Sequence, residues 1–496
     1  MIARLRAALR RIPRAGRACA AIALVNAAVW SVVVPPFHVP DEISHFGYAQ
    51  YLAETGQPPP QTPNTAQYSD EQQLALVRLH FFTVVGRGEQ RGIWTEPDER
   101  ELRAALAADP SSRGLGGASS ATNQPPLYYA LAAIPYRLSP SHGILERLAL
   151  MRLLSALMAA GTVLCVSLFL RELLPGTPWA WTAGALAVAF QTTFMFVAAG
   201  VQGDNLLVLA SAATLLLLAR VFRRGLTIRR GAALGAATAI GVLGKLTFLA
   251  FVPGIALAFL LLLLRAGRER RVALRATAVA AGIVAVPVGL YALLNVAAWE
   301  RGGGATAGSV GTATVSSGVV SLRERLVYIW QEVLPALPFM HDAFIGYAPR
   351  DLWLRGWTGH FGWLDYNFPE RVYDAAEVVF LALLTLAAVA VVRTVRARGW
   401  AAMGWHRPLA LVLLTLCAGL IGAIGWQAVV YKADTGYRFE QARYLLPLLA
   451  LYGLLVALAA RGAGRRWGPA VGAVLVVLAM AHGLFAQLLT ISRYYG

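Results

Sequence analysis

Long apolar segments recur along the chain and constrain its fold more than any other feature. A helix needs about 20 consecutive apolar residues to cross the hydrocarbon core of a bilayer, which is about 30 Å thick. Eleven segments reach or approach this length, and they lie near 18–37, 149–170, 178–200, 204–222, 231–246, 247–264, 275–297, 375–393, 408–430, 444–460 and 469–490. The sequence therefore predicts an all-α polytopic membrane protein with about 11 transmembrane helices.

Composition excludes the soluble and disordered classes. Hydrophobic residues make up 57% of the 496 residues and charged residues 14%, with a mean hydropathy of +0.56. An ordinary soluble domain is about 45–50% apolar and about 25% charged, so this chain has too few charges to cover several soluble cores. Its cysteines, Cys19, Cys165 and Cys417, all lie in apolar runs without a CxxC pair. Neither disulfides nor thiolate metal sites are expected.

The basic residues gather in alternate connections between the predicted spans. Together with Arg220, these short Arg-rich segments hold 24 of the 44 lysines and arginines but only two acids, Glu172 and Glu269; the segments are 1–17, 171–177, 223–230, 265–275, 393–407 and 461–468. The positive-inside rule places such segments in the cytoplasm, so we expect a cytoplasmic N-terminus, a retained first transmembrane helix and an outer C-terminus. The net charge of +18 is then a topology signal rather than a nucleic-acid surface.

Two large connections, 38–148 and 298–374, fall on the predicted outer side. Neither has a sustained apolar core, so the sequence predicts a single transmembrane domain over 1–496, with interfacial helices in these two extracytoplasmic loops.

An acidic motif, PDEISHFGYAQYLAETG, follows the first predicted span directly. Asp41 and Glu42 lie at its start and His45 one helical turn later. A partly desolvated carboxylate at the membrane boundary can have a raised pKa and act as a general base. With Asp204, the same three residues could ligate a divalent cation. The alternative is that both acids only cap the helix.

Further ionisable residues fall at the outer ends of several predicted spans. They are Arg152, Asp204, Lys245, Arg438 and Arg443. Charged groups at membrane depth are costly and are usually paired or functional. Guanidinium groups suit phosphate, which they bind through two parallel hydrogen bonds, so an anionic lipid headgroup is one predicted ligand. Pairing with neighbouring acids or with ordinary anionic lipids is the alternative.

The second large loop carries His360 and Asp365 within an aromatic segment, GHFGWLDYNFP. Aromatic faces beside carboxylates suit sugar rings, and they equally suit the bilayer interface. The sequence contains no GxxxxGK[ST], HExxH or GxSxG motif, and the cytoplasmic segments are too short to bind a nucleotide. An activated group must therefore come from the membrane or from outside.

Several of these segments together resemble a known family. The acidic motif, NQPPLYYALAAIPYRL, RLLSALMAAG, GVQGDNLLVLA, GVLGKLTFLAFVP, GHFGWLDYNFP and ARYLLPLLAL occur in this order over about 18–460. They resemble a bacterial polytopic family of unknown function that is grouped with the GT-C superfamily of polyprenyl-phosphate-dependent glycosyltransferases. The resemblance implies a GT-C-like fold in the bacterial inner membrane, with its active face extracytoplasmic.

The same resemblance implies transfer of a hexose or pentose from a polyprenyl-phosphate donor to an envelope glycan, lipid or protein, with inversion. Asp41 or Glu42 would be the catalytic carboxylate, and Lys245, Arg438 and Arg443 would lie near the donor phosphate. Asp204 matches a recurrent acid of the pattern, although GVQGDN departs from the commoner form with two asparagines. The remaining expected substrate-binding residues are His45, Arg152, His360 and Asp365. A flippase of lipid-linked sugars and a non-catalytic envelope-assembly protein are the alternatives.

Overall fold

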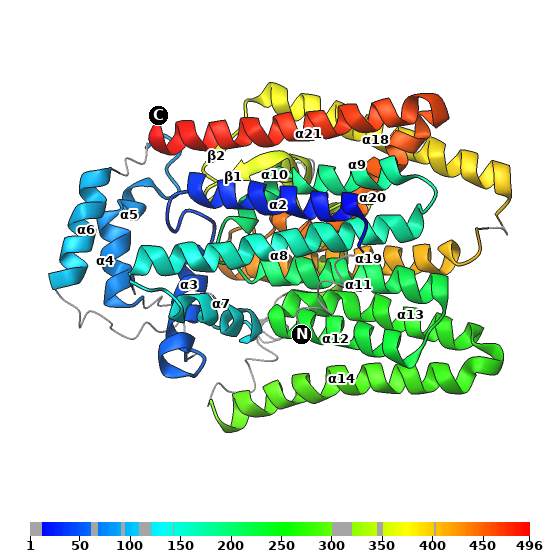
Figure 1. Cartoon of the computed structure of the whole chain (residues 1–496), viewed down its shortest axis with the longest axis horizontal. Coiled ribbons are helices and arrows are strands. Elements are labelled where there is room, and N and C mark those ends of the chain that lie inside the picture. Colours follow the sequence, from blue (N-terminus) through cyan, green and yellow to red (C-terminus); the bar gives the residue numbers. More distant parts are fainter. Residues whose placement is uncertain are drawn as a thin grey trace.

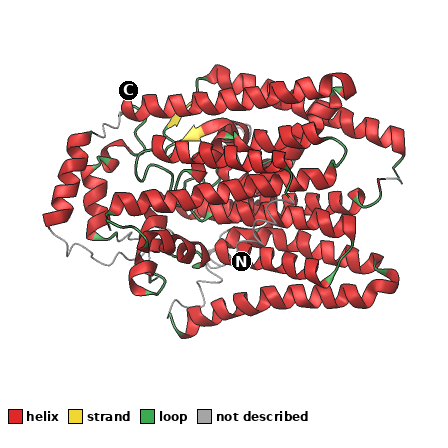
Figure 2. Cartoon of the chain, in the orientation of Figure 1, coloured by secondary structure: helices red, strands yellow, loops and turns green. Residues whose placement is uncertain are grey.

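The computed structural model describes residues 12–60, 68–90, 95–108, 121–141, 143–299, 320–344, 351–400 and 403–496. Helices make up most of this described part; loops connect them, and one short two-stranded hairpin lies among them (Figure 2). The predicted all-α membrane architecture is confirmed.

In the first half of the described chain the helices are α2 (Arg14–Val33), α3 (Glu42–Thr55), α4 (Asp70–Arg78), α5 (Phe81–Val84), α6 (Glu96–Ala108), α7 (Leu127–Arg137), α8 (Ile144–Leu173), α9 (Pro178–Ala189), α10 (Thr192–Ala198), α11 (Asp204–Arg224) and α12 (Ile228–Gly244). The second half contains η1 (Leu246–Phe251), α13 (Val252–Arg265), η2 (Gly267–Glu269), α14 (Arg270–Ala297), α16 (Leu322–Gln331), η3 (Asp351–Arg355), α17 (Gly356–Gly359), β1 (His360–Phe361), β2 (Tyr366–Asn367), α18 (Glu370–Arg398), α19 (His406–Thr435), η5 (Ala442–Leu448), α20 (Leu449–Gly462) and α21 (Gly464–Tyr495). The strands β1 and β2 pair antiparallel.

Nine helical segments of the described chain are long and apolar enough to cross a membrane. The pair α9 and α10 forms a further candidate span that is bent by 56°. Helix α12, with 17 residues, occupies the place of the predicted span 231–246. Every predicted span therefore coincides with helix, while the exact number of crossings stays a prediction.

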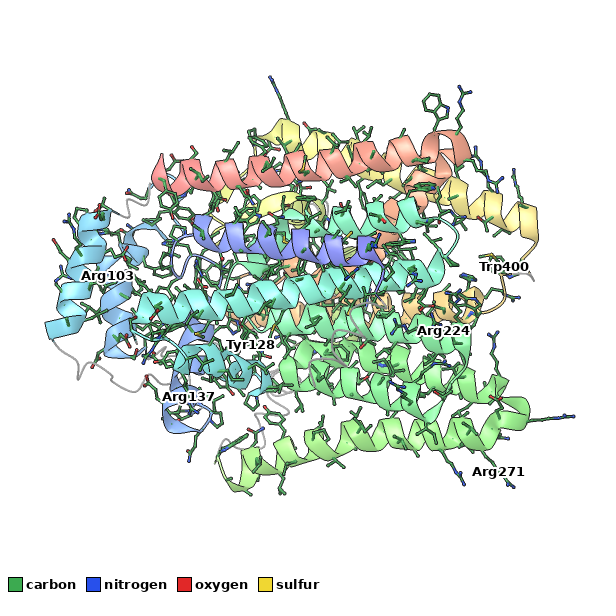
Figure 3. All side chains as sticks on the ribbon, viewed as in Figure 1. Arg103, Tyr128, Arg137, Arg224, Arg271 and Trp400 are labelled. Carbon is green, nitrogen blue, oxygen red and sulfur yellow. The ribbon has the colours of Figure 1, made fainter. Side chains whose placement is uncertain are left out.

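The long helices lie side by side, and the short helices α3 to α7 gather at one end of the molecule (Figure 1). Arg224 and Arg271, from two of the Arg-rich segments, lie at the end opposite Arg103 and Arg137 (Figure 3). At the Arg-rich end, the buried carboxylate of Glu172 accepts a 2.8 Å hydrogen bond from Arg223 and also pairs with two neighbouring arginines. Two of the Arg-rich segments thus lie at the same end of the molecule.

Two local breaks position the outer ends of the spans. Pro35 and Pro36 follow α2 and end it, because proline lacks an N–H and disfavours helix in the residue before it; Val34 is accordingly extended. The acidic motif therefore begins just beyond the first span. A second break, also expected from the sequence, occurs at Lys245, whose extended backbone separates α12 from η1.

Close contact between α9 and α20 depends on two facing glycines. A Cβ atom built on Gly184 would lie 2.3 Å from the carbonyl oxygen of Gly453. Membrane helices gain contact area where small residues let their backbones approach, and this contact lies within the main core, which draws residues from α2 through α21.

We therefore expect Gly184→Ala to destabilise the protein by about 1–3 kcal/mol, because the new methyl group must push two backbones apart. Thermal unfolding in one detergent, compared with wild type, measures this cost. Gly282→Ala is the matched control, since nothing lies within 4 Å of its Cβ position and alanine favours helix. Equal stability of the two variants would show that the α9–α20 contact is not tightly packed.

Candidate active site

A large cavity lies at the helix ends opposite the Arg-rich segments. Its volume is about 740 Å³, and its walls come from the acidic motif, the segment before α7, the break after α12, η1, α19 and η5 with the residues before it. The lining includes five residues that the sequence had singled out: Asp41, His45, Lys245, Arg438 and Arg443. Segments more than 400 residues apart therefore contribute charges to a single cavity.

The carboxylate of Asp41 faces Arg443 in this cavity. The Arg443 Nη2 atom donates a 2.5 Å hydrogen bond to Asp41 Oδ2, and the Asp41 side chain keeps 36% of its surface exposed. Asp41 is the N-cap residue of α3, but its side chain makes no capping hydrogen bond. Its backbone is left-handed, with φ of 61°, a conformation that aspartate tolerates better than most residues. The structure therefore directs this carboxylate into the cavity rather than onto the helix end.

Lys245 forms the second ion pair of the cavity. Its ammonium group donates a 2.7 Å hydrogen bond to Asp204 at the start of α11. Asp204 is only 3% exposed and accepts one hydrogen bond from the Lys245 ammonium group. An ammonium group has three N–H donors, so Lys245 can also donate to a ligand. Arg443 also has spare capacity, because its buried Nε atom has no hydrogen-bond partner. Both cations can accept an additional anion.

His45 stands beside these pairs as a buried, uncharged ring. Its Nδ1 atom lies 2.8 Å from the Tyr129 hydroxyl, and Tyr129 stacks on Tyr48 with ring centroids 3.6 Å apart. Burial, reinforced by the charge of Lys245, lowers the pKa of His45 to about 4. At neutral pH this ring is a neutral hydrogen-bonding group.

The pKa of Asp41 is lowered, whereas the sequence predicts a raised pKa. Burial alone would raise it, but the charge and hydrogen bond of Arg443, together with the charge of Lys245, lower the Asp41 pKa below its ordinary value. The expectation of a raised pKa was therefore wrong, because Arg443 arrives from a distant part of the chain. Asp41 is ionised at neutral pH.

Glu42 points away from the cavity and is fully buried. Arg152 donates to both of its carboxylate oxygens, at 2.8 and 2.6 Å. The same guanidinium donates to three carbonyl groups at the end of α2, those of Ser31, Val34 and Pro35. The backbone N–H of Val201 donates to Glu42 as well. The adjacent acids thus differ in role: Glu42 fixes the backbone that presents Asp41.

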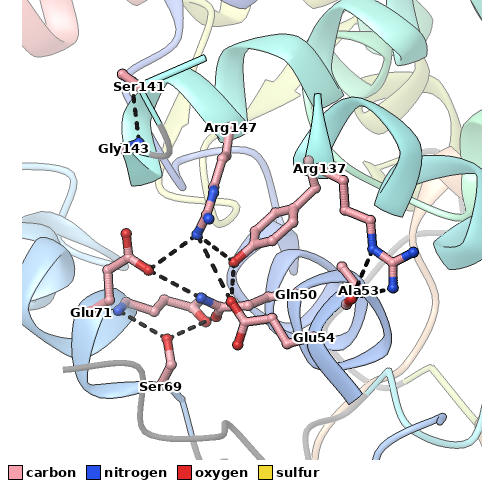
Figure 4. A network of polar contacts seen from close by, with 11 residues as sticks. Gln50, Ala53, Glu54, Ser69, Glu71, Arg137, Ser141, Gly143 and Arg147 are labelled. Carbon is pink, nitrogen blue, oxygen red and sulfur yellow. Dashed lines mark hydrogen bonds and ion pairs between the residues drawn. The ribbon is translucent and has the colours of Figure 1, made fainter. Parts of the chain in front are cut away.

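A second polar network holds the first outward region together (Figure 4). Arg147 of α8 lies 3.6 Å from the carboxylate of Glu71 in α4 and 3.9 Å from that of Glu54 in α3. The Tyr136 hydroxyl of α7 accepts a 2.6 Å hydrogen bond from Arg147 and donates to Glu54. Four helices therefore share one arginine, which fixes the wall of the cavity that α3 and α7 support.

The aromatic hairpin of the second loop lies outside the cavity lining. Asp365 pairs with Arg493 near the C-terminus at 3.2 Å, and the His360 Nε2 atom lies 3.1 Å from the Leu364 carbonyl. Arg493 also donates to carbonyl groups of Val84 and Arg87. Asp365 is therefore joined through Arg493 to the loop before α6, His360 contacts its own hairpin, and neither residue lines the cavity with Asp41.

Several lining residues had no sequence prediction. Neutral amides and aromatic rings cover much of the cavity wall, among them Asn123, Gln427, Gln441, Trp426 and Tyr431. Gln427 could have been found from the sequence, because it is an isolated amide near the end of the apolar span 408–430. The others lie in connections where polar and aromatic residues are common.

The possible metal ligands are arranged as ion pairs. Asp41, Glu42 and Asp204 each accept a hydrogen bond from a basic side chain. Within the described ranges, no group of three or more His, Cys, Asp or Glu residues could hold a metal ion. This donor set does not fit a divalent cation.

Glu332, at the end of α16, is a buried carboxyl group next to the cavity wall. It is fully buried, and neither of its carboxyl oxygens has a hydrogen-bond partner. Burial, together with the charge of Glu440, raises the pKa of Glu332 to about 9. This acid therefore keeps its proton at neutral pH.

The Glu42–Arg152 pair generates a stability prediction. Glu42→Gln leaves a buried guanidinium without its counter-charge, and we expect a loss of about 3–5 kcal/mol in the free energy of unfolding. Chemical unfolding in detergent measures it. Glu370→Gln is the control, because its pair with Arg355 is exposed and should contribute at most about 1 kcal/mol. Similar losses in both variants would contradict the role of the buried pair.

Glu332 generates a pH prediction. An unfolded glutamate has a pKa of about 4.3, so between about 4.3 and 9 the folded state holds a proton that the unfolded state releases. Stability should therefore fall as pH rises through this window, by at most about 1.4 kcal/mol per pH unit. Glu332→Gln should remove this component of the slope, as seen in unfolding temperatures between pH 5 and about 9. An unchanged slope in the variant would show that Glu332 is ionised.

Comparisons with known proteins found solved structures that overlap with this chain. No curated protein matches it. Among solved structures, ArnT from Cupriavidus metallidurans bound to undecaprenyl phosphate overlaps with a TM-score of 0.46 and 13% identity, over 89% of this chain and 59% of that one. An archaeal oligosaccharyltransferase, AglB from Archaeoglobus fulgidus in complex with an inhibitory peptide and a dolichol-phosphate, overlaps with a TM-score of 0.47 and 14% identity, over 96% and 56%. The chain thus spans less than two thirds of the length of these proteins, and overlaps of this size assign no reaction to it.

Residues 24–452 match the family described as "Predicted membrane protein (DUF2142)". This range covers most of the 496 residues and confirms the resemblance inferred from the motifs. The chain belongs to the DUF2142 family of membrane proteins.

Proposed function

We propose that this protein is a GT-C-like integral membrane glycosyltransferase that moves a sugar from a polyprenyl-phosphate donor to a hydroxyl group of an extracytoplasmic acceptor. One observation carries the proposal: a single cavity contains an ionised carboxylate, Asp41, beside two cations with unused donors, Lys245 and Arg443. A base next to a phosphate-binding pair is what transfer from a phosphate leaving group requires.

The apolar wall of the cavity supports a lipid-linked donor. Leu249 and Ala250 of η1 and Pro253 of α13 line it together with Gly419, Gly422 and Ala423 of α19. These residues belong to two candidate membrane spans, so an isoprenoid chain in the bilayer can lie against them while its phosphate reaches Lys245 and Arg443. A water-soluble nucleotide sugar has no need of such a wall.

The reaction follows from these positions. Asp41 takes the proton of the acceptor hydroxyl as its oxygen attacks the anomeric carbon, and the bond from that carbon to the phosphate oxygen breaks with its electron pair. Lys245 and Arg443 stabilise the charge that develops on the phosphate, which favours the transition state over the ground state. When Asp41 becomes neutral, Arg443 loses its internal partner and is free for the phosphate. A single displacement of this kind inverts the anomeric configuration.

The proposed orientation follows the charges. The Arg-rich end that contains Glu172 and Arg224 faces the cytoplasm of a bacterial cell, and the cavity opens toward the extracytoplasmic side. The acceptor is then an envelope glycan, a lipid or a protein that carries a free hydroxyl group.

We expect Asp41→Asn to abolish sugar transfer while polyprenyl phosphate still binds, because the base is lost but both cations remain. Mass spectrometry of lipid-linked sugars and envelope glycans in a deletion strain complemented with each variant measures transfer, and thermal stabilisation by polyprenyl phosphate measures binding. Lys245→Ala is the companion variant and should weaken binding itself.

Restored glycans with the Asp41→Asn variant would contradict the proposal, and so would a deletion strain whose glycans are unchanged. The first result fits a flippase or an assembly protein that needs no general base.

A further inference from the structure

The cavity wall away from Asp41 has a composition of its own. Amide side chains and aromatic rings contribute to it, among them Asn123, Gln427, Gln441, Trp426 and Tyr431. The outer part of α19 supplies Trp426, Gln427 and Tyr431, and Gln441 directly precedes η5. This part of the lining therefore offers uncharged hydrogen-bonding groups from α19 and from the residue before η5, the element that contains Arg443.

Amide groups of this kind suit sugar hydroxyls. Each amide offers both donors and acceptors, so it can meet a hydroxyl group in either role. The aromatic rings add apolar surface for the C–H faces of a sugar. The Arg325 guanidinium lies 4.3 Å from the centre of the Trp426 ring, which fixes one of these rings from the side of α16.

The charges around the cavity disfavour a positively charged ligand. Among the described lining residues, Lys245, Arg438 and Arg443 are basic and Asp41 is the one acid. Asp41 is already paired with Arg443, and the nearby Asp204 is buried behind Lys245. His45 is a neutral ring. An amino group entering the cavity would meet three cations and one carboxylate, Asp41, whose charge is already offset by Arg443.

Given the proposed function, we propose that the cavity selects a lipid-linked sugar without positive charge, and that Gln427 and Gln441 are the residues that recognise its hydroxyl groups. The donor would be a neutral pentosyl or hexosyl polyprenyl phosphate. A donor in which an amino group replaces one sugar hydroxyl would be rejected by the same cations that hold the phosphate.

The test measures binding of three probes to the full chain in nanodiscs: bare polyprenyl phosphate, polyprenyl phosphoglucose, and the corresponding amino-sugar lipid at pH 7. We expect polyprenyl phosphoglucose to bind about 10-fold or more tightly than the amino-sugar lipid. Gln441→Glu adds a carboxylate to the wall and should lower the ratio of the phosphoglucose affinity to the amino-sugar affinity by about 10-fold. Gln427→Glu tests the same effect from α19 if the first variant fails to fold. Gln57→Glu is the control, because Gln57 is exposed and outside the lining.

The outcomes separate the two proposals. Equal or tighter binding of the amino-sugar lipid by the wild type overturns the selectivity proposal, and so does a ratio that neither Gln441→Glu nor Gln427→Glu changes. Failure of all three probes to bind, including bare polyprenyl phosphate, overturns the proposed function instead. If bare polyprenyl phosphate binds as tightly as polyprenyl phosphoglucose, the amide side chains do not bind the sugar, and the selectivity proposal is overturned.

Discussion

The buried ion pair between Glu42 and Arg152 is the interaction on which the arrangement of the site depends. It joins the end of α2, the start of α3, the outer part of α8 and the loop before α11. Both side chains are almost fully buried, where an unpaired charge is costly. The pair therefore holds in place the turn in which Asp41 adopts its left-handed backbone. By fixing this turn, the pair helps to direct the Asp41 carboxylate at Arg443.

The ion pairs at the cavity end of the molecule fall into two groups. Glu42 with Arg152, and Asp365 with Arg493, are internal pairs that join segments of the fold. Nearer the cavity, Asp41 pairs with Arg443 across 402 residues of sequence, and this pair keeps one exposed carboxylate and one partly unused guanidinium. A charge that is satisfied on every side stabilises structure, whereas a charge with spare capacity can bind a ligand. The same residue types thus serve both purposes, and their hydrogen-bond partners decide which.

Much of this arrangement was predictable from the sequence. Ionisable residues at the ends of spans are expensive, so they were expected to gather, and Asp41, Lys245 and Arg443 do lie around one cavity. The break at Lys245 was visible as an interruption of an apolar run. The family was identified from ordered motifs, and the match confirms it.

Other features were beyond sequence reasoning for physical reasons. Adjacent acids such as Asp41 and Glu42 leave a helix start in different directions, and no pattern shows which one faces a cavity. The lowered pKa of Asp41 arises from an arginine 402 residues away. Tyr128 and Tyr129 are fully buried because helix α7 packs against α3 and α8, and the motif NQPPLYYALAAIPYRL does not show this contact.

The central claim is that the cavity between Asp41, Lys245 and Arg443 binds the phosphate of a lipid-linked sugar. Electron cryo-microscopy of the protein in nanodiscs with polyprenyl phosphate tests it directly. The account predicts phosphate density within hydrogen-bonding distance of Lys245 and Arg443, with the isoprenoid chain along α13 and α19. Phosphate density elsewhere on the protein, with this cavity empty, would contradict it.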